Sequence, residues 1–370
     1  MPSEAPQIMS VLTANPEDLA DGRGSCRAVV FPGDGTLQIR QFPMPTLPPG
    51  GAILKVEAVG MCGSDVGQFH GVNNTGRGQY PVVPGHEIVG VIFQISKEAA
   101  AAWNVKTGDR VAVDEIVHTA HGRLIYGKDF VADPEAGIGP FGGFSEYLVL
   151  LPETNVYPLT ADRPASELTI FEGLANAVAW TRHVSSGDTV VIQGPGHIGL
   201  ACVCAAREAG AATIIITGTA SDHQRLATAI RIGATHVINV EEVDPVQEVA
   251  RLTNDAMADV VIDAASNSTK TLGWALQMAK IGADIVVGGL NNFATVEGFV
   301  SDLIPMRRLT VHPGGKLEFQ RAVELINSGR VPTTELLGKV FEMDEIGEAL
   351  SLLAREIPGR DAVRVSLSLS

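Results

Sequence analysis

The chain has 370 residues, of which 45 % are hydrophobic and 19 % charged, the composition of a folded chain too long for one ordinary core. Its formal net charge of −15 argues against nucleic acid and anionic membrane surfaces as partners. No stretch of 18 uninterrupted apolar residues occurs, and no basic patch followed by an apolar run opens the chain, so we expect neither a membrane span nor a secretory signal.

Residues 1–25 contain Pro, Asp, Glu, Gly and Ser without clear periodicity, and we interpret them as an N-terminal extension. From residue 26 to about residue 160, short apolar stretches such as 52–58 and 88–93 are separated by glycines and prolines. Strands this short, with so many turn residues between them, predict an irregular β-rich, barrel-like domain.

Candidate metal ligands stand in two short motifs of this domain. Cys62 lies in a glycine-flanked turn (Gly-Met-Cys-Gly-Ser-Asp), and His86 lies in Pro-Gly-His-Glu. A third candidate, Glu172, lies in Phe-Glu-Gly. Taken singly, these residues are more often a buried cysteine, a loop histidine and a carboxylate at a helix start. Together, a cysteine, a histidine and a carboxylate leave one position of a zinc ion open for water or a substrate oxygen.

The other cysteines and a histidine pair carry weaker signals. Cys202 and Cys204 fall in a predicted apolar helix, and with Cys26 they indicate a reduced, cytoplasmic protein. His118 and His121 are spaced like metal ligands, but a solvated loop is the preferred interpretation.

From about residue 161 to residue 309 the pattern changes to alternating strands and helices. Predicted strands cover residues 189–192, 213–216, 236–239, 259–263 and 283–287, and the clearest helices cover 198–209 and 222–232. Buried strands separated by helices of this length form βαβ units on a parallel sheet. The last 60 residues, from about 310 to 370, are expected to return to the first domain.

A glycine loop, Gly194-Pro-Gly-His-Ile-Gly199, joins the first of these strands to its helix. Such a loop binds a dinucleotide because its glycines allow a tight turn, backbone approach to the pyrophosphate and close helix packing. An ordinary turn before a helix is the alternative. We therefore predict that the cofactor contacts lie at Gly194, Gly196, His197, Ile198 and Gly199.

The next strand predicts which nicotinamide cofactor is bound. In an NAD enzyme it ends in a carboxylate for the ribose hydroxyls, whereas here it continues into Thr217, Gly218 and Thr219. Thr219 and Arg225 offer donors to a 2′-phosphate, which favours NADP. A NAD site that uses neutral contacts or Asp222 remains the alternative.

In their order along the chain, these motifs resemble the zinc-containing medium-chain dehydrogenases, particularly their sorbitol-type polyol and microbial secondary-alcohol branches, from about residue 26 onward. The resemblance implies an α/β protein with a GroES-like catalytic domain and a doubly wound Rossmann domain. It implies one catalytic zinc held by Cys62, His86 and Glu172, with Glu87 close enough to exchange in as a ligand. It also implies that Ser64 takes the alcohol proton and that Asp65 orients His86.

The chain departs from this family at several positions. Gly173 replaces the proline that normally follows the glutamate, and Gly67 replaces a histidine that ends the proton relay in many relatives. His70, or the ribose and water, would then carry the proton. The four cysteines of the family's structural zinc lobe are missing, so we expect no structural zinc. The resemblance further implies a homodimer or homotetramer, formed through the strand near residues 283–289 and its neighbours.

The leading functional interpretation is a zinc-dependent dehydrogenase that oxidises a secondary alcohol or polyol, or reduces the corresponding ketone or aldehyde, with NAD(P). A zinc-free quinone or enoyl reductase of the same superfamily is the first alternative, although such relatives usually lack the Cys/His/Glu set. A non-catalytic binding protein on the same fold is the second, because a fold does not establish a function. Substitution of Cys62, His86 or Glu172 should abolish activity and zinc binding under the leading interpretation and change little under the two alternatives.

Overall fold

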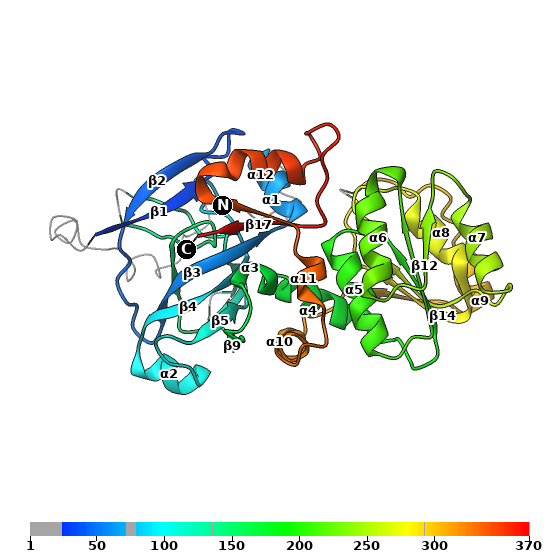
Figure 1. Ribbon diagram of the computed structural model, residues 1–370, viewed down its shortest axis with the longest axis horizontal. Coiled ribbons are helices and arrows are strands. Elements are labelled where there is room, and N and C mark those ends of the chain that lie inside the picture. The colour runs from blue at the N-terminus through cyan, green and yellow to red at the C-terminus, as the bar shows by residue number, and fades with distance from the viewer. Residues whose placement is uncertain (1–23, 72–78, 121, 135–136, 292, 370) are drawn as a thin grey trace. The chain divides into compact units, whose positions relative to one another are not determined.

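The computed structural model describes residues 24–71, 79–120, 122–134, 137–291 and 293–369. The chain divides into two compact units (Figure 1). The first contains the described residues up to Thr169, residues 339–360 and those from Val365 on, and the second contains residues 170–338 and 361–364. The N-terminal extension was expected at residues 1–25, and residues 1–23 of it lie outside the described residues. In the described part of the chain, no helix has the length and apolar character needed to cross a membrane.

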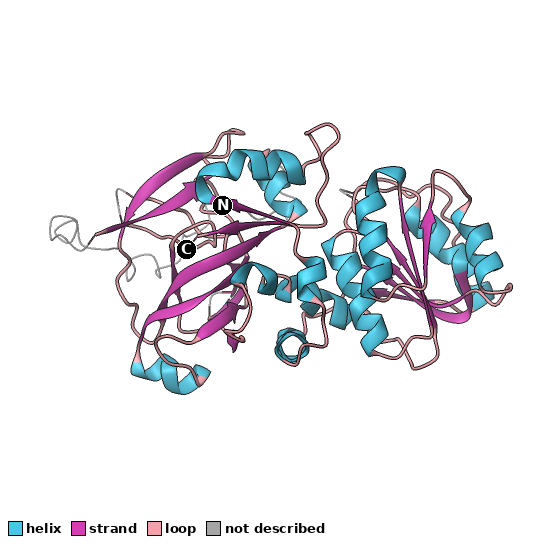
Figure 2. Cartoon of the chain, viewed as in Figure 1, coloured by secondary structure: helices cyan, strands magenta, loops and turns pink. Residues whose placement is uncertain are grey.

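The first unit consists mainly of strands (Figure 2). Its strands are β1 (Ser25–Val30), β2 (Gln38–Pro43), β3 (Ala52–Met61), β4 (Glu87–Ile95), β5 (Arg110–Val113), β6 (Ile116–Thr119), β7 (Gly122–Ile125), β8 (Tyr147–Leu150), β9 (Val156–Pro158), β16 (Lys339–Glu342) and β17 (Val365–Ser368). Its helices are α1 (Gly63–Phe69), α2 (Lys97–Trp103), α3 (Ala165–Leu168) and α12 (Ile346–Leu353). The largest sheet has the order β16-β17-β3-β4-β5-β9, with β8 also paired to β3. The predicted β-rich domain is confirmed.

The second unit alternates strands and helices. Its strands are β10 (Thr189–Gln193), β11 (Thr213–Gly218), β12 (His236–Asn239), β13 (Ala258–Asp263), β14 (Ala279–Val287) and β15 (Thr310–Pro313). Its helices are α4 (Phe171–Trp180), α5 (His197–Glu208), α6 (His223–Ile232), α7 (Pro245–Leu252), α8 (Thr271–Met278), α9 (Leu303–Arg307), α10 (Phe319–Asn327) and α11 (Thr333–Leu336). The parallel sheet has the order β12-β11-β10-β13-β14-β15, with α5 and α6 on one face and α7 and α8 on the other (Figure 1). This is the doubly wound Rossmann order, so the predicted fold class is confirmed.

The second unit extends to Gly338, beyond the end expected at residue 309. The reason is that β15 continues the parallel sheet beside β14, and α10 packs against α4. The rings of Phe171 on α4 and Phe319 on α10 are 5.9 Å apart at their centroids, and the amide of Glu318 donates to the carbonyl of Ala175. The return to the first unit comes at Lys339, where β16 pairs with β17.

A buried carboxyl at the end of β13 makes the stability of this unit depend on pH. Asp263 is fully buried, and burial raises the pKa of its carboxyl to about 6, although it accepts hydrogen bonds from Thr271 Oγ1 and the amide of Ala265. The pKa of Asp263 in the folded protein lies above its ordinary value of 3.8. The protonated carboxyl therefore contributes its full stabilisation below pH 3.8, and this stabilisation is lost as the pH rises to about 6. Above pH 6 the buried charge opposes folding.

We therefore expect Asp263→Asn to flatten the pH dependence of unfolding. Between pH 4.5 and 7.5, the unfolding free energy of the variant relative to the native chain should rise by about 2 kcal/mol, measured by urea titration at both pH values. Asp255→Asn is the matched control, because Asp255 is exposed and has a φ of 65° that asparagine tolerates. Equal pH dependence in both variants would show that Asp263 carries no buried charge.

Candidate active site and cofactor loop

Cys62 and His86 lie at neighbouring ends of two paired strands. Strand β3 ends at Met61 and the antiparallel strand β4 begins at Glu87, with Gly60 opposite Glu87 in the register. The residue just after β3 and the residue just before β4 therefore lie side by side, and the side chains of Cys62 and His86 are hydrogen-bonded. Two motifs separated by more than twenty residues thus form one site.

Asp65 fixes the geometry of this pair. Cys62 is the N-cap of α1, and its amide donates to Asp65 Oδ2 at 2.8 Å. The other carboxylate oxygen, Oδ1, lies 3.4 Å from Nδ1 of His86, and both side chains are buried. A carboxylate on one ring nitrogen fixes the orientation of an imidazole and leaves the second nitrogen available to a ligand. This is the placement in which Asp65 would orient His86.

The two buried groups form an ion pair. Burial alone would raise the pKa of the Asp65 carboxyl, but the His86 imidazole and the Cys62 amide outweigh it and hold that pKa below its usual value. Burial and the charge of Lys128 alone would lower the pKa of the His86 imidazole, but Asp65 and the Cys62 side chain raise it well above its usual value. A metal cation can take the place of the imidazole proton at such a site. The donor set of thiol, imidazole and orienting carboxylate therefore fits a zinc ion.

The remaining cysteines do not compete for this role. Cys26, Cys202 and Cys204 are buried, whereas Cys62 is partly exposed. Burial raises the pKa of the Cys26 and Cys204 thiols to about 12, so neither forms a thiolate at neutral pH.

The two candidate glutamates lie in different units. Glu87, the first residue of β4, is fully buried in the first unit. Glu172 lies in the first turn of α4 in the second unit, where it is buried and its Oε1 accepts a hydrogen bond of 2.7 Å from Asn176 Nδ2. Their roles as zinc ligands stay predictions.

Lys128 is a candidate site residue that no sequence pattern indicated. It follows Gly127, whose absent side chain lets this turn lie against the backbone of Gly85, since a Cβ at Gly127 would lie 2.5 Å from the Gly85 carbonyl oxygen. The ammonium of Lys128 donates to Ser64 Oγ at 3.4 Å. The contact joins residues 64 positions apart in the chain, and nothing in the local sequence of Lys128 predicts it.

The alternative proton carrier and the histidine pair lie elsewhere. His70 ends α1, is exposed, and has its Nε2 4.0 Å from Glu356 Oε1. His118 is exposed on β6, and His121 lies outside the described residues. In the same unit, the ring of Phe130 stacks on the rings of Tyr126 and Phe141.

The three glycines of the glycine loop in the second unit differ in backbone geometry and in the space around them. Gly194 has a φ of +93°, which only glycine adopts readily, and a Cβ at Gly199 would lie 1.9 Å from the Gly194 carbonyl oxygen. Gly196 is the N-cap of α5, and a Cβ there would meet no atom within 4 Å. The loop therefore packs tightly on its protein side and is open at Gly196, where a pyrophosphate would approach the N-terminus of α5. His197 and Ile198 form the first turn of that helix.

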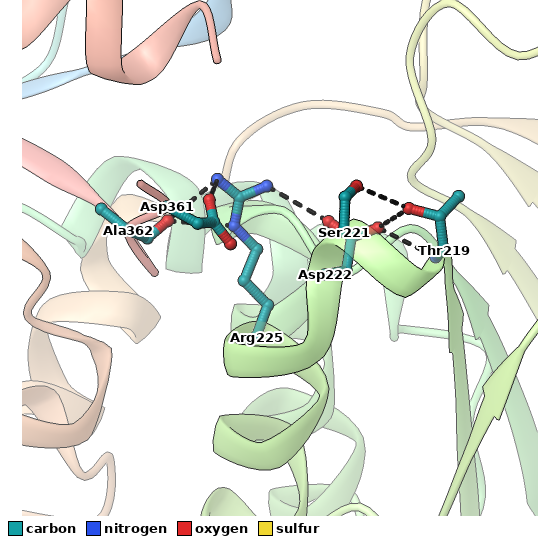
Figure 3. Close-up of polar contacts among 6 residues, drawn as sticks. All are labelled: Thr219, Ser221, Asp222, Arg225, Asp361 and Ala362. Carbon is teal, nitrogen blue, oxygen red and sulfur yellow. Dashed lines mark hydrogen bonds and ion pairs between the residues drawn. The ribbon is translucent and has the colours of Figure 1, made fainter. Parts of the chain in front are cut away.

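The residues after β11 form a compact polar cluster (Figure 3). Asp222 Oδ2 accepts hydrogen bonds from the amide and the hydroxyl of Thr219, at 2.9 and 2.8 Å, and that hydroxyl lies 2.9 Å from Ser221 Oγ. Gly218 packs against Pro195 of the glycine loop, because a Cβ at Gly218 would lie 2.8 Å from the proline ring. The strand end thus presents hydroxyls next to the loop, and the Asp222 carboxylate is engaged in capping.

Arg225 points away from the Thr219 hydroxyl toward a later segment of the chain (Figure 3). Its guanidinium donates to the carbonyl of Ala362 at 2.9 Å and pairs with Asp361 at 3.0 Å and Asp222 at 3.4 Å. A direct contact with a 2′-phosphate would have to replace some of these bonds. No local sequence pattern predicts that Asp361 and Ala362 are partners of Arg225.

Comparison with known proteins adds to this geometry. Residues 48–161 match the alcohol dehydrogenase GroES-like domain, and residues 198–328 match the zinc-binding dehydrogenase model. The chain is 30 % identical to the Mycobacterium tuberculosis protein named probable alcohol dehydrogenase, over 90 % of this chain and 95 % of that one. It is 29 % identical to the erythritol/L-threitol dehydrogenase of Mycolicibacterium smegmatis, over 92 % of this chain and 97 % of that one. A protein of Sinorhizobium meliloti 1021, assigned to the zinc-binding dehydrogenases and crystallised with NADP, superposes with a TM-score of 0.80 at 25 % identity, over 93 % and 99 % of the two chains.

Proposed function

The chain belongs to the zinc-type alcohol and polyol dehydrogenases of the medium-chain family, and from this premise we propose that it oxidises a secondary alcohol or polyol at a zinc ion held by Cys62, His86 and Glu172. The observation that carries the proposal is the buried Asp65 carboxylate, which bridges the Cys62 amide and the His86 imidazole. A metal-bound imidazole is neutral and almost always donates its other ring N–H to an acceptor such as this carboxylate, so Asp65 is the partner expected beside a ligating His86. Glu87 is kept as a ligand that can exchange in.

The chain's own residues divide the work of the reaction. When bound, zinc polarises the alcohol oxygen and lowers its pKa. Asp65 holds His86 in the ligating orientation. Ser64 accepts the substrate hydroxyl proton at Oγ while its own hydroxyl proton passes on to water or the cofactor ribose, and the glycine loop would hold the nicotinamide cofactor, which supplies the hydride acceptor. The reverse reaction reduces the ketone or aldehyde.

A panel of secondary alcohols, four- to six-carbon polyols and their ketones, assayed with NAD and with NADP, tests the substrate class. Oxidation of at least one alcohol that depends on bound zinc supports the proposal. Reduction of quinones or enones, unchanged when zinc is removed, would instead establish the zinc-free reductase alternative, and activity on neither panel would favour the binding protein.

Lys128 is proposed to orient the Ser64 hydroxyl. Because its ammonium donates to Ser64 Oγ, the serine proton is directed to another acceptor, and the positive charge favours negative charge on that oxygen. We expect Lys128→Met to lower kcat roughly fivefold, equivalent to about 1 kcal/mol, with little change in KM for the cofactor. Lys106→Met is the control, because Lys106 is an exposed lysine of the same unit. Equal kcat in the two variants would remove Lys128 from the mechanism.

We further propose that the cofactor is NADP. Thr219 and Ser221 present hydroxyls where an NAD enzyme has a carboxylate, and the charge of Asp222 is engaged by Thr219 and Arg225. Arg225 would act as a neighbouring positive charge. Thr219→Asp should lower kcat/KM for NADP by about tenfold or more relative to NAD, since the new carboxylate repels a 2′-phosphate. A native chain that already prefers NAD would contradict the proposal.

We propose a homodimer or homotetramer, which light scattering in solution distinguishes from a monomer. In the described sheet β14 is flanked by β13 and β15, so edge pairing of two sheets would run through β15. Val311 on this strand and Met306 on the preceding helix expose apolar side chains.

A further inference from the structure

A second cluster of ligating side chains lies in the second unit, on residues to which the proposed reaction gives no role. It consists of His183 in the turn after α4, Asp284 on β14 and His312 on β15. Asp284 and Val286 share one face of the sheet because strand side chains alternate, and Val286 is paired with His312. Asp284 and His312 therefore project from the same face of adjacent strands.

Two glycines bring His183 to this face. A Cβ at Gly288 or at Gly314 would lie 2.2 or 2.4 Å from atoms of the Trp180 indole, so the indole lies directly against the backbone where β14 and β15 end. Trp180 is the last residue of α4, and the turn that follows carries His183. The local sequence thus builds the cluster from three separate elements.

The three side chains converge on one carboxylate oxygen. His312 Nε2 lies 2.6 Å from Asp284 Oδ1, and His183 Nδ1 lies 4.0 Å from the same oxygen. The two imidazoles stack with centroids 3.9 Å apart, and one ligand atom from each of the three residues lies within 4.8 Å of the others. The side chains are only 20 to 31 % exposed, so the cluster is sheltered but still accessible to solvent.

We propose that His183, Asp284 and His312 bind a divalent zinc-type cation, with water in the remaining position. Two imidazoles and a carboxylate form a ligand set that zinc accepts readily. Stacked imidazoles sharing one carboxylate cannot both be charged without repulsion, whereas a cation placed among the three replaces the proton between His312 and Asp284. This site is independent of the proposed catalytic zinc.

Arg182 limits the affinity of the site. Its Nε donates to His183 Nε2 at 3.0 Å, so the neutral imidazole carries its proton on Nδ1, the nitrogen that faces Asp284. Binding of a cation at Nδ1 moves that proton to Nε2 and displaces the exposed Arg182 side chain. Arg182→Ala should therefore bind zinc more tightly than the native chain, and an unchanged or weaker affinity would overturn the assignment of Nδ1 as ligand.

Zinc binding to the full chain tests the proposal, and the Cys62→Ser background separates the two sites. With Zn²⁺ as the probe in equilibrium dialysis, we expect one ion per chain to remain in that background. Adding His312→Ala should weaken its binding at least about 100-fold. The matched control is His236→Ala, since His236 lies on β12, the opposite edge strand of the same sheet. Equal zinc binding with His312→Ala and with His236→Ala would overturn the proposal. If Cys62→Ser alone removes all of the bound zinc, this second site does not exist, and the proposed function still stands.

A second measurement needs no substitution at the site. Diethyl pyrocarbonate modifies accessible imidazoles, and mass spectrometry of peptides from the native chain locates the products. Added Zn²⁺ should protect His183 and His312 at least severalfold and leave His236 unprotected. Modification of His183 and His312 that is the same with and without Zn²⁺ would also overturn the proposal.

Discussion

Cys62→Ser should abolish alcohol oxidation without disturbing the fold. The thiolate is the one sulfur ligand of the proposed zinc ion, and the hydroxyl that replaces it is a much weaker ligand. We expect kcat/KM for the alcohol to fall by about a thousandfold or more, equivalent to about 4 kcal/mol, and the zinc content to fall by one ion per chain. The measurements are steady-state kinetics and metal analysis by mass spectrometry on the same preparation.

The fold should survive because serine suits this position. Cys62 is the N-cap of α1 and takes part in a capping box with Asp65, and serine is among the preferred N-cap residues. Cys26→Ser is the matched control, because it makes the same substitution at a cysteine that is buried in the core of the same unit. Full activity of the Cys26 variant with loss in the Cys62 variant supports the zinc site. Activity retained by Cys62→Ser would rule out the catalytic zinc.

The sequence predicted the parts of the site that local motifs carry. The glycine loop was recognisable because the turn, the backbone approach and the helix packing each require glycine at a fixed spacing. The predicted strands and helices around it were confirmed because their apolar runs are long and bounded by turn residues. Cys62 and His86 stood in motifs of the same kind, although only the register of β3 and β4 shows that they adjoin.

What the sequence did not predict depends on contacts between distant segments. The Lys128 contact with Ser64 needs two glycine backbones to pass closely, and the partners of Arg225 lie 136 and 137 positions further on. The extension of the second unit to Gly338 follows from the pairing of β15 with β14. The His183 cluster arises from a turn and two strands that share no motif. Each is a tertiary contact, which local propensity does not encode.

The second large effect is expected at the glycine loop, where two alanine substitutions should fail for different reasons. Gly199 faces the Gly194 carbonyl oxygen, and because the contacted atom belongs to the backbone, it cannot turn aside as a side chain would. Gly199→Ala should therefore destabilise the protein by about 3 kcal/mol and also lose cofactor binding. Thermal unfolding and cofactor titration followed by fluorescence measure the two effects.

Gly196→Ala should leave stability unchanged and still abolish cofactor binding. An added Cβ there meets no protein atom within 4 Å, and the φ of −65° and ψ of 176° are accessible to alanine. The methyl group instead occupies the space where the pyrophosphate approaches the first turn of α5, so the dissociation constant for the cofactor should rise about tenfold or more. A stable Gly196→Ala variant that binds the cofactor normally would place the pyrophosphate elsewhere. Loss of binding with an unchanged melting temperature would separate the role of Gly196 in ligand contact from that of Gly199 in packing, a distinction that the glycine pattern alone does not make.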